Sequence, residues 1–194
     1  MQLLRMFSTA KYKGKKGYLK TQKKYEILRT FLYFGISLSL FAAGLITTKT
    51  RLNLLTVVAI LGCLPASKSA VGMIMFLRFR GCSEENAKEI EKHSEGLFCL
   101  YDMVFTSYQK NYNVAHLAVK GNTVCGYTQD GAFDEQSFYQ HIDGMLKADG
   151  LTNVSVKIFK DLSKYTSRLE QMGKLDTDQG NSQNVIDSLK NIAL

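Results

Sequence analysis

Residues 30–77 read TFLYFGISLSLFAAGLITTKTRLNLLTVVAILGCLPASKSAVGMIMFL, two apolar runs with a short basic connection between them. The first run, 30–48, has no charged residue and would form a helix about 28 Å long, close to the hydrocarbon thickness of a bilayer. The second run, 52–77, would be about 39 Å long as a helix. The pattern predicts a membrane protein with a two-helix transmembrane hairpin, and we assign residues 30–81 to it.

Positive charge flanks this hairpin unevenly. Residues 1–29 carry nine Lys and Arg, whereas the connection carries only Lys49 and Arg51. Because Lys and Arg favour the cytoplasmic side, we expect a multi-pass protein of the plasma (inner) membrane with both termini in the cytoplasm. The residues expected at the membrane interface or facing lipid are Lys23, Lys24, Arg29, Lys68, Arg78 and Arg80.

Lys68 interrupts the second run, three residues after Pro65, the chain's single proline. Counted from Leu52, it lies about 24 Å along a helix, near the end of a crossing of about 28 Å. We favour snorkelling to the inner headgroups; the alternatives are an anionic-lipid or inter-subunit contact, or a pore. Residues 70–77 would then leave the bilayer and need a cover, which makes a homo-oligomer or another membrane protein an expected partner.

Small residues recur at every fourth position in both apolar runs. This spacing lets membrane helices approach closely, so it predicts the packing contact of the hairpin. The residues assigned to it are Gly35, Ser39 and Ala43 on the first helix and Gly62, Ala66 and Ala70 on the second.

The net charge of +8 conceals two opposite parts. Residues 1–81 hold 14 Lys and Arg and one acid, whereas residues 82–194 hold 11 Lys and Arg and 16 acids. The basic arm, 1–29, therefore predicts attraction to the anionic inner leaflet, with RNA binding as a less favoured alternative. The acidic C-terminal part makes nucleic acid an unlikely partner there.

Four cysteines without a CxxC spacing predict free thiols rather than disulfides or a zinc site. They are Cys63, Cys82, Cys99 and Cys125. S-acylation of Cys82, just past the second run, is the alternative.

The C-terminal part alternates helical and strand patterns. Ser83 is a candidate N-cap for a first helix, and Gly121-Asn122 is a two-residue turn between alternating apolar strands. The order α-β-β-β-α-β-α predicts a small cytoplasmic α+β domain with a mainly antiparallel sheet over residues 82–175. A linker and a short amphipathic C-terminal helix follow over 176–194.

This order resembles the α-β-β-β-α-β core of restriction-endonuclease-like proteins. Their chemistry needs an Asp on one strand and Asp/Glu-x-Lys on the next, to hold a metal. Here Asp102 and Lys120 fall on successive predicted strands, but Ala118 takes the place of the second acid. The resemblance therefore implies at most a degenerate relative. We expect no catalytic residues, no metal and no cofactor.

A basic pair on a predicted helix is the one candidate binding site in this domain. Lys164 and Arg168 lie one turn apart after Asp161. A solvated helix face is the preferred interpretation, and a small-anion site is the alternative.

These observations favour a non-enzymatic integral membrane protein whose hairpin anchors a cytoplasmic interaction or sensor domain in an oligomer. One alternative is a ligand-gated pore opened by the domain. Others are the degenerate nuclease and an enzyme with an unrecognised site.

Overall fold

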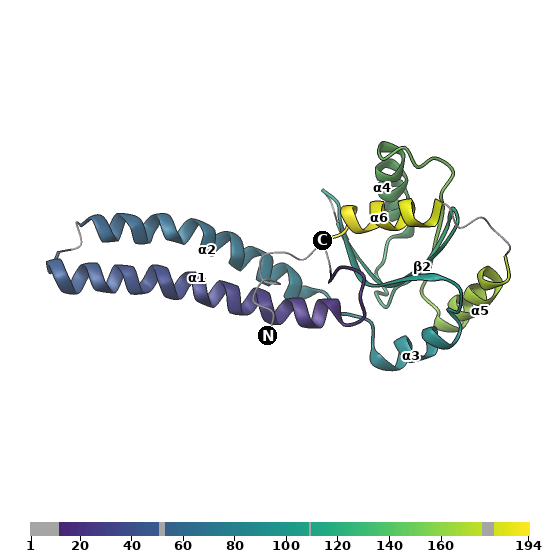
Figure 1. Ribbon diagram of the computed structural model, residues 1–194, viewed down its shortest axis with the longest axis horizontal. Helices are drawn as coiled ribbons and strands as arrows, with labels where there is room; N and C mark the ends of the chain where they lie inside the picture. Colours follow the sequence, from purple (N-terminus) through teal and green to yellow (C-terminus); the bar gives the residue numbers. More distant parts are fainter. Residues whose placement is uncertain (1–11, 51–52, 109, 176–180) are drawn as a thin grey trace. The chain divides into compact units, whose positions relative to one another are not determined.

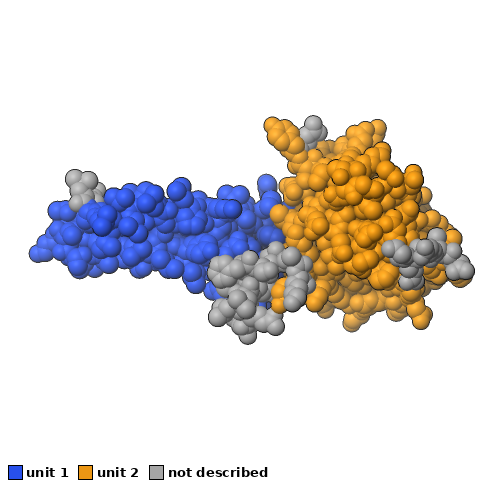
Figure 2. Space-filling view, turned by 45° about the horizontal axis from the view of Figure 1, so that its top comes forward, with its two compact units in different colours: residues 1–8, 19–79 blue, residues 9–18, 80–194 orange. Residues whose placement is uncertain are grey.

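The computed structural model describes residues 12–50, 53–108, 110–175 and 181–194. These residues fall into two compact units. Among the described residues, the hairpin unit comprises 19–79 and the domain unit comprises 12–18 with 80–194, as coloured in Figure 2.

The hairpin unit consists of the helices α1 (Tyr18–Thr48) and α2 (Leu54–Arg78), drawn in purple and blue in Figure 1. Both are long and apolar enough to span a membrane. Asn53 caps α2, because its side-chain oxygen accepts a hydrogen bond of 2.8 Å from the Thr56 amide. The helix continues through Pro65.

Polarity is inverted in the hairpin relative to a water-soluble helix pair. Only 17% of the residues in the most apolar window of each helix are buried. Large apolar side chains point outward: Phe31 is 72% exposed, Ile46 77% and Leu54 78%. The buried positions between residues 30 and 69 hold small or polar side chains, namely Thr30, Ser37 and Gly44 on α1 and Ala59, Ala66 and Ser69 on α2.

The predicted packing stripe is corrected on α1. A Cβ added at Gly35 would meet no atom of α2 within 4 Å, and Ser39 and Ala43 are exposed. From Thr30 onward the buried α1 positions are instead Thr30, Ser37 and Gly44, which are seven residues apart, the repeat along which helices that cross at a small angle meet. On α2, Gly62 does face α1, since a Cβ there would lie 2.7 Å from Ser37 Oγ; Ala66 is fully buried and Ala70 is half-buried.

The domain unit follows the predicted order of elements. They are α3 (Glu84–Lys92), β1 (Phe98–Thr106), β2 (Asn111–Lys120), β3 (Thr123–Tyr127), α4 (Glu135–Ala148), β4 (Ser155–Phe159), α5 (Leu162–Gly173) and α6 (Ser182–Ile192). The strands form one sheet in the order β1-β2-β3-β4. The first two pairings are antiparallel, but β3 and β4 are parallel. The sheet is therefore mixed, because α4 carries the chain back before β4 begins.

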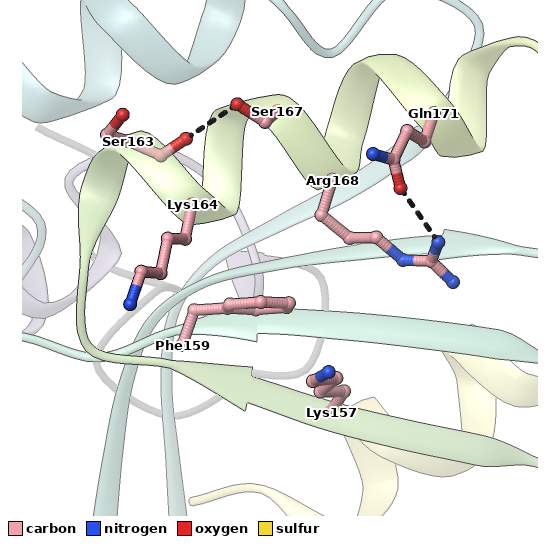
Figure 3. Close-up of a pocket in the computed structure, with 7 residues that line it drawn as sticks. All are labelled: Lys157, Phe159, Ser163, Lys164, Ser167, Arg168 and Gln171. Carbon is pink, nitrogen blue, oxygen red and sulfur yellow. Dashed lines mark hydrogen bonds between the residues drawn. The ribbon is translucent and has the colours of Figure 1, made fainter.

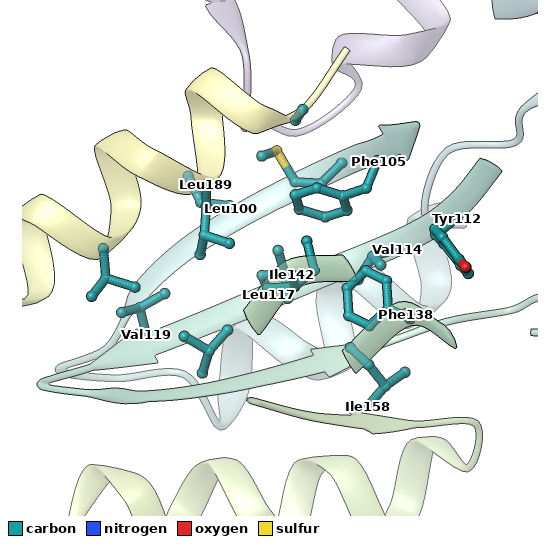
Figure 4. Close-up of a cluster of buried hydrophobic side chains, with 14 of the residues drawn as sticks. Leu100, Phe105, Tyr112, Val114, Leu117, Val119, Phe138, Ile142, Ile158 and Leu189 are labelled. Atoms are coloured by element: carbon teal, nitrogen blue, oxygen red, sulfur yellow. The ribbon is translucent and has the colours of Figure 1, made fainter. Parts of the chain in front are cut away.

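Helices cover both faces of this sheet. In Figure 1, α4 and α6 lie on one side, and α3 and α5 lie on the other. The larger hydrophobic cluster lies under α4 and α6 and includes Phe105, Leu117, Phe138 and Leu189 (Figure 4). A second cluster under α3 and α5 includes Ala118, Tyr165 and Leu169.

Residues of the predicted basic arm complete the edge of the sheet. The Tyr101 amide donates to the Gly14 carbonyl at 2.8 Å, and the Leu194 amide donates to the Val104 carbonyl at 2.8 Å. Lys13 Nζ donates to the Ala193 carbonyl at 2.7 Å. The free edge of β1 is thus paired toward both of its ends, which protects it from pairing with other chains.

Gly126 on β3 lies against the core of the domain. A Cβ there would lie 2.5 Å from Ile158 Cδ1 and 2.8 Å from Leu117 Cδ2. We expect Gly126→Ala to lower the free energy of unfolding by about 1–3 kcal/mol through overpacking. Gly144→Ala is the control, because that α4 glycine has nothing within 4 Å and alanine favours helix. Urea denaturation of the full-length protein in micelles measures both, and a stabilised Gly126→Ala protein would contradict the expectation.

Candidate functional site

The two residues of the predicted anion site line one open pocket of the domain. The pocket has a volume of about 510 Å³, and we call it the cationic pocket. Its lining residues are Lys157, Phe159, Ser163, Lys164, Ser167, Arg168 and Gln171. Figure 3 shows Lys164 and Arg168 reaching from α5 toward β4, with the Phe159 ring between the helix and Lys157.

Local structure places these side chains together. Lys157 and Phe159 are two residues apart on β4, so they share one face of this edge strand, while Ile158 points into the core on the other face. Lys164 and Arg168 are four residues apart on α5, so they also share a face. Asp161 fixes the start of α5, because its carboxylate accepts from the Ser163 amide at 2.9 Å.

The charge of the cationic pocket is not neutralised by described carboxylates. No described acid forms an ion pair with Lys157, Lys164 or Arg168. Arg168 Nη1 donates to Gln171 Oε1 at 3.1 Å, and Lys157 Nζ lies 5.3 Å from the centre of the Phe159 ring. The cations are therefore available to an anion from solution.

A buried thiol lies near Arg168. Burial raises the pKa of the Cys125 thiol, and the guanidinium of Arg168 acts in the opposite direction. Cys125 is fully buried and is one of four free cysteines, as predicted from their spacing. A raised pKa keeps this thiol protonated at neutral pH, so the thiol is not a nucleophile.

A histidine and two tyrosines meet in the core beneath α5. His116 is fully buried, and its Nδ1 lies 2.6 Å from the Tyr165 hydroxyl. Tyr165 in turn donates to the Cys125 carbonyl at 3.4 Å, and the Tyr101 ring packs edge-on against His116 at 4.4 Å. Burial lowers the pKa of His116 to about 3, so the ring is neutral and belongs to the core.

Asp102 and Lys120, the two residues that resemble part of the nuclease motif, do not lie at one site. Asp102 lies between Tyr101, which pairs with His116, and Met103, which pairs with Val114, so Lys120 is at least four residues farther along β2, roughly 13 Å. Asp102 accepts from the Cys82 amide at 2.8 Å, and Lys120 Nζ donates to the Gly173 carbonyl at 2.8 Å. Both side chains thus make structural contacts. Among the described residues, no three His, Cys, Asp or Glu side chains are grouped to hold a metal.

The predicted interface residues of the hairpin have different surroundings. Lys68 is exposed, as are Lys24 and Arg78. Lys23 Nζ lies 3.4 Å from the Leu77 carbonyl near the end of α2. Arg80, also exposed, belongs to the domain unit, and its carbonyl accepts from Asn113 at 2.7 Å.

Arg29 belongs to a polar cluster that sequence reasoning missed. It pairs with Glu26, the one acid of residues 1–81, and its Nε donates to Ser69 Oγ on α2 at 3.2 Å. Thr30 and Ser69 share a hydrogen bond of 2.9 Å, and Gln22 donates to Glu26 at 3.0 Å. Glu26 at i and Arg29 at i+3 were a visible signal for the ion pair, but the partner on α2 was not.

Breaking this cluster should loosen the hairpin. We expect Glu26→Ala to destabilise the contact between α1 and α2 by roughly 1–3 kcal/mol, because Arg29 loses its counter-charge in a half-buried place. SDS titration of the full-length protein in mixed micelles, followed by circular dichroism, measures the loss. The double variant Glu26→Leu with Arg29→Met should recover most of it, and Lys24→Ala should have no effect. Equal losses in the single and double variants would contradict the expectation.

Comparisons with protein-family models, with curated proteins and with solved structures return no match, so the assignment of function depends on the chain's own geometry.

Proposed function

We propose that the α1–α2 hairpin crosses the plasma membrane twice and anchors the α+β domain at the cytoplasmic face, where the domain acts as an interaction or sensor module. The inverted polarity of the hairpin is the observation that carries this proposal. A soluble helix pair would bury side chains such as Phe31 and Ile46, which are here 72% and 77% exposed. Lipid is the solvent that suits an apolar exterior around a small and polar interior.

The edge of the sheet supports a double crossing. Gly14, before α1, bonds to Tyr101, and Cys82, after α2, bonds to Asp102. Segments on both sides of the hairpin therefore belong to one domain unit. A chain that leaves this unit and returns to it must cross a membrane an even number of times. The nine Lys and Arg of residues 1–29 favour the cytoplasm as the shared side.

Extraction and labelling test the anchor and its orientation. The protein should stay in the membrane pellet at alkaline pH and enter solution only with detergent. In a cysteine-free background, Lys49→Cys should react with an impermeant maleimide on intact cells. Tyr108→Cys, at a fully exposed site of the domain, should react only after permeabilisation. Release by alkali, or labelling of Tyr108→Cys on intact cells, would refute the proposal.

Lipid and self-association are part of the same proposal. Exposed Lys24 and Arg78 are the candidates for anionic headgroups, whereas Lys13 and Lys16 are already engaged by the Ala193 carbonyl and by Glu91. A homo-oligomer would cover apolar surface such as Val71 and Ile74 on α2, which are 65% and 55% exposed. Crosslinking in native membranes should give a ladder above the monomer, and a monomer alone would exclude the oligomer.

A further inference from the structure

The cationic pocket gathers positive charge in a part of the chain that is rich in acids. Residues 82–194 carry five more acids than bases, yet none of the pocket's seven lining residues is acidic. With Lys13, Lys15, Lys16 and Arg80 included, the domain unit is close to neutral, so its net charge does not attract anions at long range. Affinity for an anion must therefore come from the arrangement of Lys157, Lys164 and Arg168 at close range.

The number and type of these cations suit a phosphate group. A phosphate monoester carries a charge of about −1.5 to −2 at pH 7, which matches three cations better than a single carboxylate does. Arg168 offers a planar fork that binds two phosphate oxygens at once, while Lys157 and Lys164 act as point charges. The bond of 3.1 Å from Arg168 to Gln171 holds the guanidinium on the pocket side of α5.

Phe159 gives the cationic pocket an apolar surface beside its charges. Its ring lies between the cations of α5 and Lys157 in Figure 3. Lys157 lies against the ring, with Nζ 5.3 Å from the ring centre. An aromatic face next to phosphate-binding cations can stack a flat ring of the ligand. The volume of about 510 Å³ is in the range of small-molecule sites.

We propose that the cationic pocket binds a phosphorylated small molecule with a flat ring, of the size of a mononucleotide. Arg168, Lys164 and Lys157 hold the phosphate, and the ring of the ligand lies against Phe159. The proposal concerns the domain unit, so it goes beyond the membrane anchor and does not depend on it.

Calorimetric titration of the full-length protein in non-ionic detergent tests this site. The titrants are AMP, ribose 5-phosphate and inorganic phosphate, and AMP should bind most tightly. Arg168→Gln should weaken AMP binding about tenfold or more, because it removes charge-assisted hydrogen bonds. Lys164→Gln, at an exposed position, should also weaken it. Lys88→Gln removes the same charge from the exposed side of α3 and should change nothing.

Phe159→Leu separates the two parts of the site. It should weaken binding of AMP several-fold and leave ribose 5-phosphate unchanged, because only AMP has a ring to stack. Short-chain phosphatidic acid, as a further titrant, represents a lipid headgroup as the source of phosphate. The proposal is overturned if no phosphate compound binds, or if Arg168→Gln and Lys88→Gln behave alike. It is also overturned if phosphatidic acid binds more tightly than AMP. Unchanged thermal unfolding of each variant shows that a loss of binding is not a loss of fold.

Discussion

Lowering the pH from 7 to 5 should reduce the free energy of unfolding of the α+β domain by about 2 kcal/mol through His116 alone. Burial lowers the pKa of His116 to about 3, whereas an unfolded chain has a histidine pKa of about 6.5. Between these values the unfolded chain binds a proton that the folded chain does not. The stabilisation is therefore complete above pH of about 6.5 and is lost progressively as the pH falls toward 3.

The hydrogen bonds of the core explain why His116 stays neutral. His116 Nδ1 shares a hydrogen bond of 2.6 Å with the Tyr165 hydroxyl, which also lies 3.4 Å from the Cys125 carbonyl. His116 Nε2 is buried without a hydrogen-bond partner among the described residues. A proton added at this nitrogen would place an uncompensated charge in the core.

Urea denaturation at pH 7, 6 and 5 measures this loss, because most carboxylates remain ionised in that range. His116→Gln should unfold with a flatter pH dependence than the parent protein. His93→Gln is the matched control. Its free energy of unfolding should fall between pH 7 and 5 as in the parent protein, since His93 lies at the surface between Glu89 and Glu170. A pH dependence that survives in His116→Gln would contradict the assignment.

Truncating Phe138 should destabilise the domain by about 3–5 kcal/mol, a large share of the 5–15 kcal/mol that such domains have. Phe138 on α4 is 1% exposed. Its ring packs against Phe105 and Tyr112 at centroid distances of 5.6 and 5.3 Å, and against Phe133 at 5.1 Å. Phe138→Ala leaves a cavity that this rigid aromatic cluster cannot refill.

Met145→Ala on the same helix is the control, because Met145 is 41% exposed and its loss should cost less than about 0.5 kcal/mol. Both variants are measured by urea denaturation of the full-length protein in micelles. A loss below about 1 kcal/mol for Phe138→Ala would mean that α4 is not packed as described.

In the hairpin, the sequence pattern predicted the two helices but not the face along which they meet. Hydropathy alone identified two helices long enough to span a membrane, because length and apolar composition are properties of each segment. It failed to identify the face of α1 that meets α2. Gly35, Ser39 and Ala43 have the same small size as the true contact residues, and the choice between the two stripes depends on the crossing angle of the helices.

In the cationic pocket, too, the sequence pattern predicted the residues of one helix but not the strand residues that join them. The i, i+4 spacing of Lys164 and Arg168 was visible on α5, so one side of the site was predictable. Lys157 and Phe159 joined it only because β4 pairs parallel to β3 and brings its outer face under α5. No local pattern encodes that pairing.

The sequence by itself determined the order of the elements, the apolar hairpin and the free cysteines, because each follows from local composition and periodicity. The tertiary structure alone decided which helix faces meet, that Gly14 and Ala193 complete the β1 edge, and that His116 is neutral. It also decided that three cations share one pocket. These features depend on contacts between residues that are far apart in the chain, and burial and partner choice exist only once the chain has folded.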